Sequence, residues 1–130
     1  MARAMAYDDI DPAKVIRNKE GGPDQPAASV FPFFWAAKDQ PRDPTAFLVR
    51  YEKGTESNAH YHGADQFQIV LEGKGKLGHH ELPAYSVHFA RGYTPYGPLF
   101  PDKEEGWAFM TLRVRPNPVG TQRIHLESAR

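Results

Sequence analysis

Two histidines and a glutamine near the middle of the chain form the pattern most typical of a chemical site. His60 and His62 are separated by one residue, so on a strand both imidazoles project from the same face, with Cα atoms about 7 Å apart. Gln66 follows after a small turn, and its amide oxygen can approach the pair from the neighbouring strand. This arrangement predicts a metal site made by His60, His62 and Gln66.

A histidine pair with this spacing also arises by chance, because the chain has 6 histidines. The wider block gives the pair more weight. Its five positions, Gly54, His60, His62, Gln66 and Gly73, are separated in turn by five, one, three and six residues. This block resembles the first sequence motif of the cupin superfamily, with a glutamine where that motif has a glutamate. The chain is therefore similar to a small single-domain cupin of the RmlC-like superfamily.

The second cupin motif, which contains the histidine that completes a metal site, is degenerate in this chain. The stretch 81–99 resembles it, with Thr94 and Pro95 at the approach to the histidine and Tyr96 in the place of the histidine itself. An alternative register places His88 at that position. We prefer the first register because more of the surrounding residues match.

The resemblance covers about residues 45–115 and implies an all-β fold, a double-stranded β-helix or cupin jelly-roll barrel with an N-terminal arm. Residues 1–29 are then the arm and linker, and residues 30–130 the cupin domain. The 12 prolines and 11 glycines support this fold, because the segments between them are short and typical of strands. The strand candidates are residues 30–35, 46–52, 60–62, 66–72, 74–79, 86–91, 107–115 and 122–126.

The metal-binding residues of a cupin lie inside the barrel, which fixes the two faces of the strand that begins at Gln66. Gln68 and Val70 share the face of Gln66 and are therefore predicted to line the pocket. The residues predicted to pack outside the barrel against other strands are Phe67, Ile69 and Leu71.

Local patterns give further predictions outside this block. Asp11 and Pro12 predict the cap and first residue of a helix of one or two turns. Residues 18–29 have the composition of a linker, and residues 116–121 that of a turn. The residues whose alternation predicts a core-facing side of the strand 107–115 are Ala108, Met110, Leu112 and Val114.

The glutamine at position 66 changes the chemistry expected of a metal site. A divalent Mn, Fe, Co, Ni or Zn ion held by His60, His62 and Gln66 has only neutral protein ligands, so it is a stronger Lewis acid and favours an anionic ligand. The alternative interpretation is that Gln66 marks a barrel that has lost its metal.

His88 and Tyr96 are the candidate catalytic residues, and each has several interpretations. His88 alternates with Val87 and Phe89, so it can point into the barrel as a displaced ligand, a general base or a core histidine. Tyr96 can donate a hydrogen bond, act as an acid or base, or simply pack.

Composition excludes several classes of partner. Lysine and arginine together equal aspartate and glutamate, at 16 each, so no net charge draws the chain to nucleic acid or to an anionic membrane. The chain has no cysteine, which removes disulfides and thiolate chemistry. The longest apolar stretch, residues 30–37, is too short to cross a membrane. The N-terminus lacks an apolar signal segment, so a cytoplasmic location is the default.

Three functions remain open from the sequence. The leading hypothesis is a metal-dependent lyase, isomerase or dioxygenase that acts on a small oxygen-bearing metabolite. The alternatives are a metal-free module that binds a small sugar or acid, and a metal-free acid–base enzyme similar to cupin epimerases. The resemblance also implies a homodimer, to which the apolar segment 30–37 lends a strand.

Overall fold

The computed structural model describes residues 2–19, 26–36, 42–115 and 122–123 of the chain. Within these residues the chain forms short strands and two 3₁₀ turns. The elements are η1 Tyr7–Asp9, η2 Pro12–Lys14, β1 Ile16–Asn18, β2 Ala28–Phe34, β3 Thr45–Tyr51, β4 His60–Tyr61, β5 Gln66–Leu77, β6 His80–Pro83, β7 Val87–Ala90, β8 Leu99–Pro101, β9 Trp107–Arg113 and β10 Gln122–Arg123.

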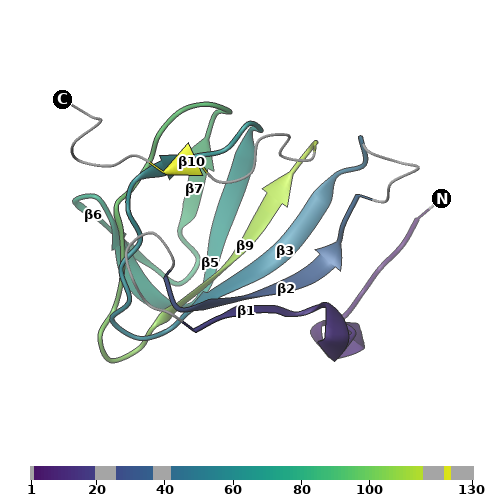
Figure 1. The fold of residues 1–130 in the computed structure, drawn as a ribbon, viewed down its shortest axis with the longest axis horizontal. Coiled ribbons are helices and arrows are strands. Elements are labelled where there is room, and N and C mark those ends of the chain that lie inside the picture. The colour runs from purple at the N-terminus through teal and green to yellow at the C-terminus, as the bar shows by residue number, and fades with distance from the viewer. Residues whose placement is uncertain (1, 20–25, 37–41, 116–121, 124–130) are drawn as a thin grey trace.

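An antiparallel sheet forms the largest part of the fold. Strands β1, β2, β3, β9 and β5 lie side by side in that order, and β7 pairs with the first half of β5 (Figure 1). Strands β4 and β10 form a separate two-stranded sheet. This arrangement confirms the predicted all-β fold, and it supports the prediction that the interior faces of the strands enclose a barrel.

Strand β5 bends and joins two parts of the barrel. Its first half pairs with β9 and β7, while residues 74–77 pair with β6 and β8. The register shifts between Val70 and Glu72, and Gly73 then takes a φ of +69°. A Cβ atom at Gly73 would overlap the carbonyl oxygen of Gly106, so glycine is needed there. The two strands predicted at 66–72 and 74–79 are therefore one bent strand.

The faces of β5 agree with the prediction on the inside and in part on the outside. Gln66 and Val70 are buried in the interior and Gln68 is half-buried between them. Phe67 and Leu71 lie on the outer face, where they are 49% and 41% exposed. Phe67 contacts Phe89 of the neighbouring strand β7, with ring centroids 5.0 Å apart, so the predicted packing against another strand is present for Phe67 although the side chain stays partly exposed.

The face of β9 that was predicted to be core is only partly buried. Trp107, Phe109 and Thr111 point to the interior, whereas Leu112 and Val114 on the opposite face are 38% and 72% exposed. The prediction for Leu112 and Val114 is therefore wrong. Both faces of β9 are apolar near its start, so alternation alone does not say which face lies inside.

The N-terminal segment covers the outer face of the sheet at β2, β3 and β9. Ile10 packs there in one buried cluster with Phe31, Leu48 and Ala108. The predicted helix is reduced to the turn η2, in which the Asp11 carboxylate accepts a hydrogen bond from the amide of Ala13, as a cap does. The turn η1 lies before the predicted helix. The chain then continues into β1, which pairs with β2.

The structure describes only part of the predicted linker and of the predicted C-terminal segments. Within 18–29, Asn18 ends β1 and residues 28–29 begin β2, while residues 20–25 lie outside the described residues. The predicted turn at 116–121 also lies outside them, and of the strand predicted at 122–126 only residues 122–123 are described, as β10. In the described part of the chain, no helix has the length and apolar character needed to span a membrane.

Candidate active site

Backbone pairing brings His60 and Tyr96 together from two distant segments. The amide of His60 donates to the carbonyl of Tyr96 at 3.0 Å, and the amide of Tyr96 donates back at 2.9 Å. The amide of Tyr93 donates to the carbonyl of His62. These bonds fix the segment after β7 against β4, so the two side chains stack with ring centroids 4.6 Å apart.

A directed chain of hydrogen bonds runs through Tyr96. His60 Nδ1 lies 2.9 Å from the carbonyl oxygen of Asn58. A carbonyl only accepts, so Nδ1 carries the proton and Nε2 is an acceptor. The Tyr96 hydroxyl, 3.1 Å from Nε2, therefore donates to His60. Gln66 Nε2 in turn donates to the Tyr96 oxygen at 2.7 Å.

Arg113 ends this chain and fixes the orientation of Gln66. Its Nε donates to Gln66 Oε1 at 2.9 Å, and its guanidinium lies over the ring of Phe47. Rotating the Gln66 amide by half a turn would set its NH₂ group against the Arg113 N–H, which places two donors face to face. Burial lowers the pKa of Arg113, yet a guanidinium keeps its proton in proteins.

Three imidazoles surround the Tyr96 ring. The ring centroids of His60, His62 and His88 lie 4.6, 6.0 and 5.1 Å from that of Tyr96. His60 and His62 are buried and their rings are 5.1 Å apart. The structure thus brings together the candidate catalytic residues and the candidate ligands that the sequence proposed.

His88 is a half-buried, neutral histidine on β7. Its Nδ1 lies 3.2 Å from Gln68 Oε1, and Gln68 Nε2 faces Thr111 Oγ1 at 3.5 Å. With its amide oriented in this way, Gln68 accepts, so His88 Nδ1 donates and Nε2 keeps a lone pair. Burial lowers the pKa of His88 below its usual value of 6.5. His88 is therefore uncharged at neutral pH and able to accept a proton.

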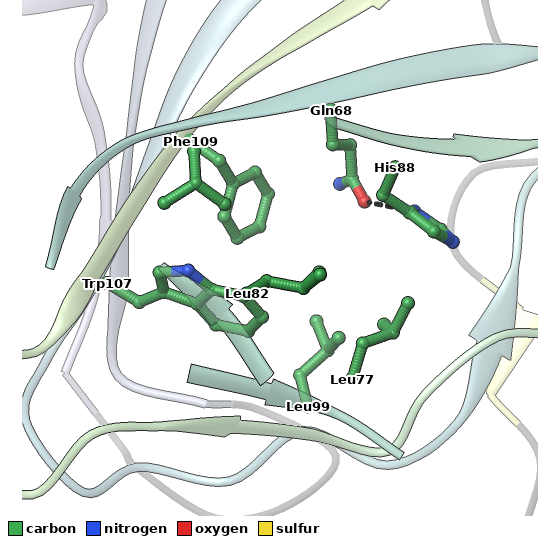
Figure 2. A pocket seen from close by; sticks show the side chains of 8 residues that line it. Gln68, Leu77, Leu82, His88, Leu99, Trp107 and Phe109 are labelled. Atoms are coloured by element: carbon green, nitrogen blue, oxygen red, sulfur yellow. Dashed lines mark hydrogen bonds between the residues drawn. The ribbon is translucent and has the colours of Figure 1, made fainter. Parts of the chain in front are cut away.

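A pocket inside the barrel begins at His88 and Gln68 and is otherwise apolar (Figure 2). The volume open to the centre of a water molecule is about 10 Å³, which is room for about one water. The apolar wall consists of Val70, Leu77, Leu82, Leu99, Trp107 and Phe109. Gln68 and Val70, both predicted to line the pocket, do line it.

Comparisons with solved structures identify this architecture. The polyketide cyclase RemF from Streptomyces resistomycificus matches with a TM-score of 0.72 and 14% identity, over 97% of this chain and 87% of that chain. A cupin-2 domain protein from Rhodospirillum rubrum matches with a TM-score of 0.67 and 12% identity, over 99% and 84% of the two chains. The chain has the fold of a small cupin.

A third similar cupin shows how widely this fold is shared. A sugar phosphate isomerase of the cupin superfamily from Silicibacter pomeroyi matches with a TM-score of 0.63 and 22% identity, over 88% of this chain and 76% of that chain. No protein-family model matches the sequence. None of the curated proteins is significantly similar to it. At these identities the comparisons establish the fold only. The chemistry has to be inferred from the residues of the site.

The residues of this cupin barrel do not fit a metal ion held through Gln66. The Gln66 oxygen already accepts from Arg113, and its NH₂ group faces Tyr96. A cation at this point would also lie beside a buried guanidinium. Among the described residues, no three histidine, cysteine, aspartate or glutamate side chains form a cluster able to hold a metal. The predicted metal centre stays a prediction, and Gln66 is arranged as a link between Arg113 and Tyr96.

Sequence reasoning missed two residues of the site, Arg113 and Trp107. Both lie on the interior face of β9, which the alternation in the sequence assigned to the other side. Arg113 was detectable as the residue that faces Gln66 across the two strands once the pairing of β5 with β9 was known. No pattern in the sequence indicated Trp107. Its place in the site follows only from the structure, where the side chain is 3% exposed.

Proposed function

We propose that this cupin is a metal-free acid–base enzyme that moves a proton on a small oxygen-bearing molecule bound in the barrel. The observation that carries this proposal is the directed chain from Arg113 through Gln66 and Tyr96 to His60, in which every donor has an acceptor. Such a chain holds one phenol in a fixed position. Beside it stands His88, an uncharged imidazole that lines the pocket.

His88 is the base in this scheme and Tyr96 is the acid. His88 Nε2 removes a proton from a carbon next to a carbonyl group of the substrate, and Tyr96 gives its hydroxyl proton to the carbonyl oxygen, which yields an enol. The phenolate left on Tyr96 is stabilised by the Gln66 N–H, which the Arg113 cation polarises. Return of both protons, with the carbon proton delivered to a different face or carbon, completes an isomerisation.

The fold does not choose among the reactions of this class. The similar structures include a cyclase, a sugar phosphate isomerase and an oxalate decarboxylase. The same fold thus supports several chemistries, so the assignment rests on the side chains of the site, which are the hydrogen-bond chain through Tyr96 and the neighbouring His88.

Deuterium exchange tests the proposal without knowledge of the substrate. Chelator-treated protein is incubated in D₂O with a panel of small ketones and ketoses, and exchange at the carbon beside the carbonyl is followed by NMR. We expect exchange with at least one compound, reduced by about 100-fold or more in Tyr96→Phe and in His88→Gln. His80→Gln, which removes an exposed histidine on β6, is the matched control and keeps the rate.

The predicted metal site is the alternative outcome of the same experiment. His60 supports it, because the bond from Nδ1 to Asn58 leaves Nε2 as an acceptor toward the interior, as in metal-bound histidines. Elemental mass spectrometry of untagged protein measures the metal content. One equivalent of metal in the wild type, lost in His60→Ala together with the exchange activity, would overturn the metal-free proposal.

In this proposal the chain forms a homodimer through the outer face of the sheet at β5 and β7. Phe67 and Phe89 lie there with ring centroids 5.0 Å apart, beside the exposed Val87. This apolar surface suits a second copy of the chain, because a twofold dimer pairs one patch with itself. The segment predicted to lend a strand does not suit this role, since β2 is already paired with β1 and β3.

Light scattering at micromolar concentration measures the dimer. We expect a dimeric mass for the wild type and a monomeric mass for Phe67→Asp. Ile16→Asp is the control, because Ile16 is 58% exposed on β1, at the far edge of the sheet. A monomeric wild type would contradict the expected dimer and leave the proposal for the site untouched.

A further inference from the structure

We propose that Arg113 and Thr45 bind a carboxylate group of the substrate, so that the enzyme acts on a small keto acid. This inference rests on the proposed function for the keto group and for the place of the substrate beside Tyr96. It adds the second functional group of the substrate and the residues that select it.

Arg113 is a half-buried cation that has no carboxylate partner among the described residues. Its Nε donates to Gln66, and its guanidinium lies over the ring of Phe47. In the described part of the chain, the one ion pair joins Arg50 to Glu72, and both of these side chains are exposed. A cation withdrawn from water is usually paired with an anion, because its lost hydration is otherwise not compensated. The N–H donors on the two Nη atoms of Arg113 therefore remain for a ligand.

Thr45 adds a buried hydroxyl beside this cation. The side chain is 7% exposed, and its Oγ1 has no hydrogen-bond partner among the described residues. A buried hydroxyl without a partner destabilises the fold, so a partner from outside the chain is expected there. Thr45 on β3 is the direct register partner of Arg113 on β9. Their side chains therefore share one face of the sheet, with Cβ atoms about 5 Å apart.

Strand pairing extends this pair to the site of the proposed reaction. Arg113 is also the register partner of Gln66, because β9 lies between β3 and β5 in the sheet (Figure 1). Gln66 Nε2 in turn donates to the Tyr96 oxygen at 2.7 Å. A single amide group thus separates Arg113 from Tyr96. A substrate whose carbonyl oxygen accepts from Tyr96 can reach Arg113 with a second group a few atoms away.

A carboxylate is the second group that fits both residues. Its two oxygens accept side by side from a guanidinium, and they have further lone pairs for a hydroxyl donor such as that of Thr45. Phe47 and Trp35, whose rings are 5.3 Å apart, place aromatic surface next to the guanidinium. Opposite charges attract more strongly beside such surface than in open water. A neutral acceptor would satisfy the hydroxyl and leave the charge of Arg113 unpaired.

A matched pair of ligands tests the role of the charge. Levulinate and its methyl ester have the same ketone, and only levulinate is an anion. Each is titrated into the ¹⁵N-labelled full chain while the Nε–H signals of the arginines are followed by NMR, with the exposed Arg91 as the internal reference. We expect levulinate to bind at least about tenfold more tightly than the ester and to shift the Arg113 signal but not that of Arg91. Equal affinities, or no binding of levulinate, would overturn the inference.

Thr45→Val tests the hydroxyl, because valine keeps the shape of threonine and removes the donor. We expect levulinate to bind about tenfold more weakly, with no loss in the free energy of unfolding, since no hydrogen bond within the chain is broken. Thr55→Val is the matched control. Thr55 is 8% exposed and its Oγ1 accepts from the amide of Ala27, so this variant should lose stability and keep the preference for levulinate. Unchanged binding of levulinate to Thr45→Val would overturn the inference.

Arg113→Gln tests the cation and should abolish the preference for levulinate over its ester. Arg91→Gln, which removes an exposed cation, is the control and should keep this preference. If Arg113→Gln does not fold, Thr45→Val and the titration of the wild type decide. Chloride that shifts the Arg113 signal as strongly as levulinate at the same concentration would indicate a general anion site and overturn the keto acid assignment.

Deuterium exchange separates this inference from the proposed enzyme. Faster exchange of levulinate than of its ester, lost in Tyr96→Phe, supports both. Binding of levulinate beside Arg113 without exchange in any ketone or keto acid overturns the proposed function and leaves the carboxylate site in place. Exchange in neutral ketones, without any preference for levulinate, overturns only the carboxylate assignment.

Discussion

The two ends of the barrel interior bury polar atoms in opposite ways. Around Tyr96, the side chains of Arg113, Gln66 and His60 form a chain in which each donor meets an acceptor. Around Trp107, the wall is apolar and the one indole donor has no acceptor among the described residues. Strands β5 and β9 contribute to both ends, so along these two strands the difference comes from the side chains.

This difference separates two tasks of the proposed enzyme. A saturated hydrogen-bond chain fixes the position of its members, which suits groups that transfer protons. The apolar end is held by the packing of a buried hydrophobic cluster, which suits stability of the barrel. Predictions that disturb one end should therefore leave the other largely intact.

The largest effect is expected from removing volume at the apolar end. Leu99 is 2% exposed and packs in the cluster with Val70 and Trp107. Leu99→Ala leaves a cavity there and should lower the free energy of unfolding by about 2–5 kcal/mol, as measured with urea. The neighbouring Phe100→Ala on the outside, at 36% exposure, is the control and should lower it by less than about 1 kcal/mol. Equal losses would mean that this end is not tightly packed.

A smaller loss of stability is expected from breaking the chain at the polar end. Gln66→Leu keeps the size of the side chain and leaves both Arg113 Nε and the Tyr96 oxygen without their partner. We expect a loss of about 1–3 kcal/mol in the free energy of unfolding. Gln68→Leu, whose bonds are longer at 3.2 and 3.5 Å, should lose less. A larger loss in the free energy of unfolding for Gln68→Leu would mean that the hydrogen bonds of Gln68 stabilise the fold more than those of Gln66.

Gln66→Glu should convert the polar end from one that disfavours cations into one that binds them. The carboxylate has no N–H to give to Tyr96, so the hydroxyl donates to Glu instead and releases His60 Nε2. We expect Ni²⁺ or Zn²⁺ to bind at least about tenfold more tightly than to the wild type in calorimetry. If the wild type binds these ions as tightly, the orientation of Gln66 does not control the site.

The smallest effect concerns the pH dependence that His88 contributes at the junction of the two ends. Burial lowers the pKa of His88 in the folded state, so the unfolded chain takes up the proton first as the pH falls. The stability from the neutral form is complete above pH 6.5 and is lost as the pH falls from there through the folded pKa. Urea unfolding at pH 7.5 and 5.5 should show a smaller difference for His88→Gln than for the wild type. The control His80→Gln should keep the wild-type difference.

Sequence patterns predicted the polar end well because its residues are close in sequence or belong to one motif. His60, His62 and Gln66 lie within one short block, and the two-residue period of β5 placed Gln68 and Val70 inside. Arg113 was missed because its contact with Gln66 depends on the pairing of β5 with β9, which joins residues 47 positions apart. The same alternation misplaced Leu112 and Val114, since it gives two faces and does not name the inner one.

The amino-acid sequence by itself determined that the chain forms many short strands, because proline and glycine interrupt it. It also determined that two histidines share one face and that a glutamine on the neighbouring strand can approach them. The tertiary structure alone decided what Gln66 does. An amide has a donor end and an acceptor end, and the sequence does not state which end faces the histidines. Arg113, brought to Gln66 by strand pairing, takes the acceptor end and turns the donor end toward Tyr96. A predicted metal ligand thereby becomes the link that positions a phenol, because hydrogen-bond direction is set by neighbours in space.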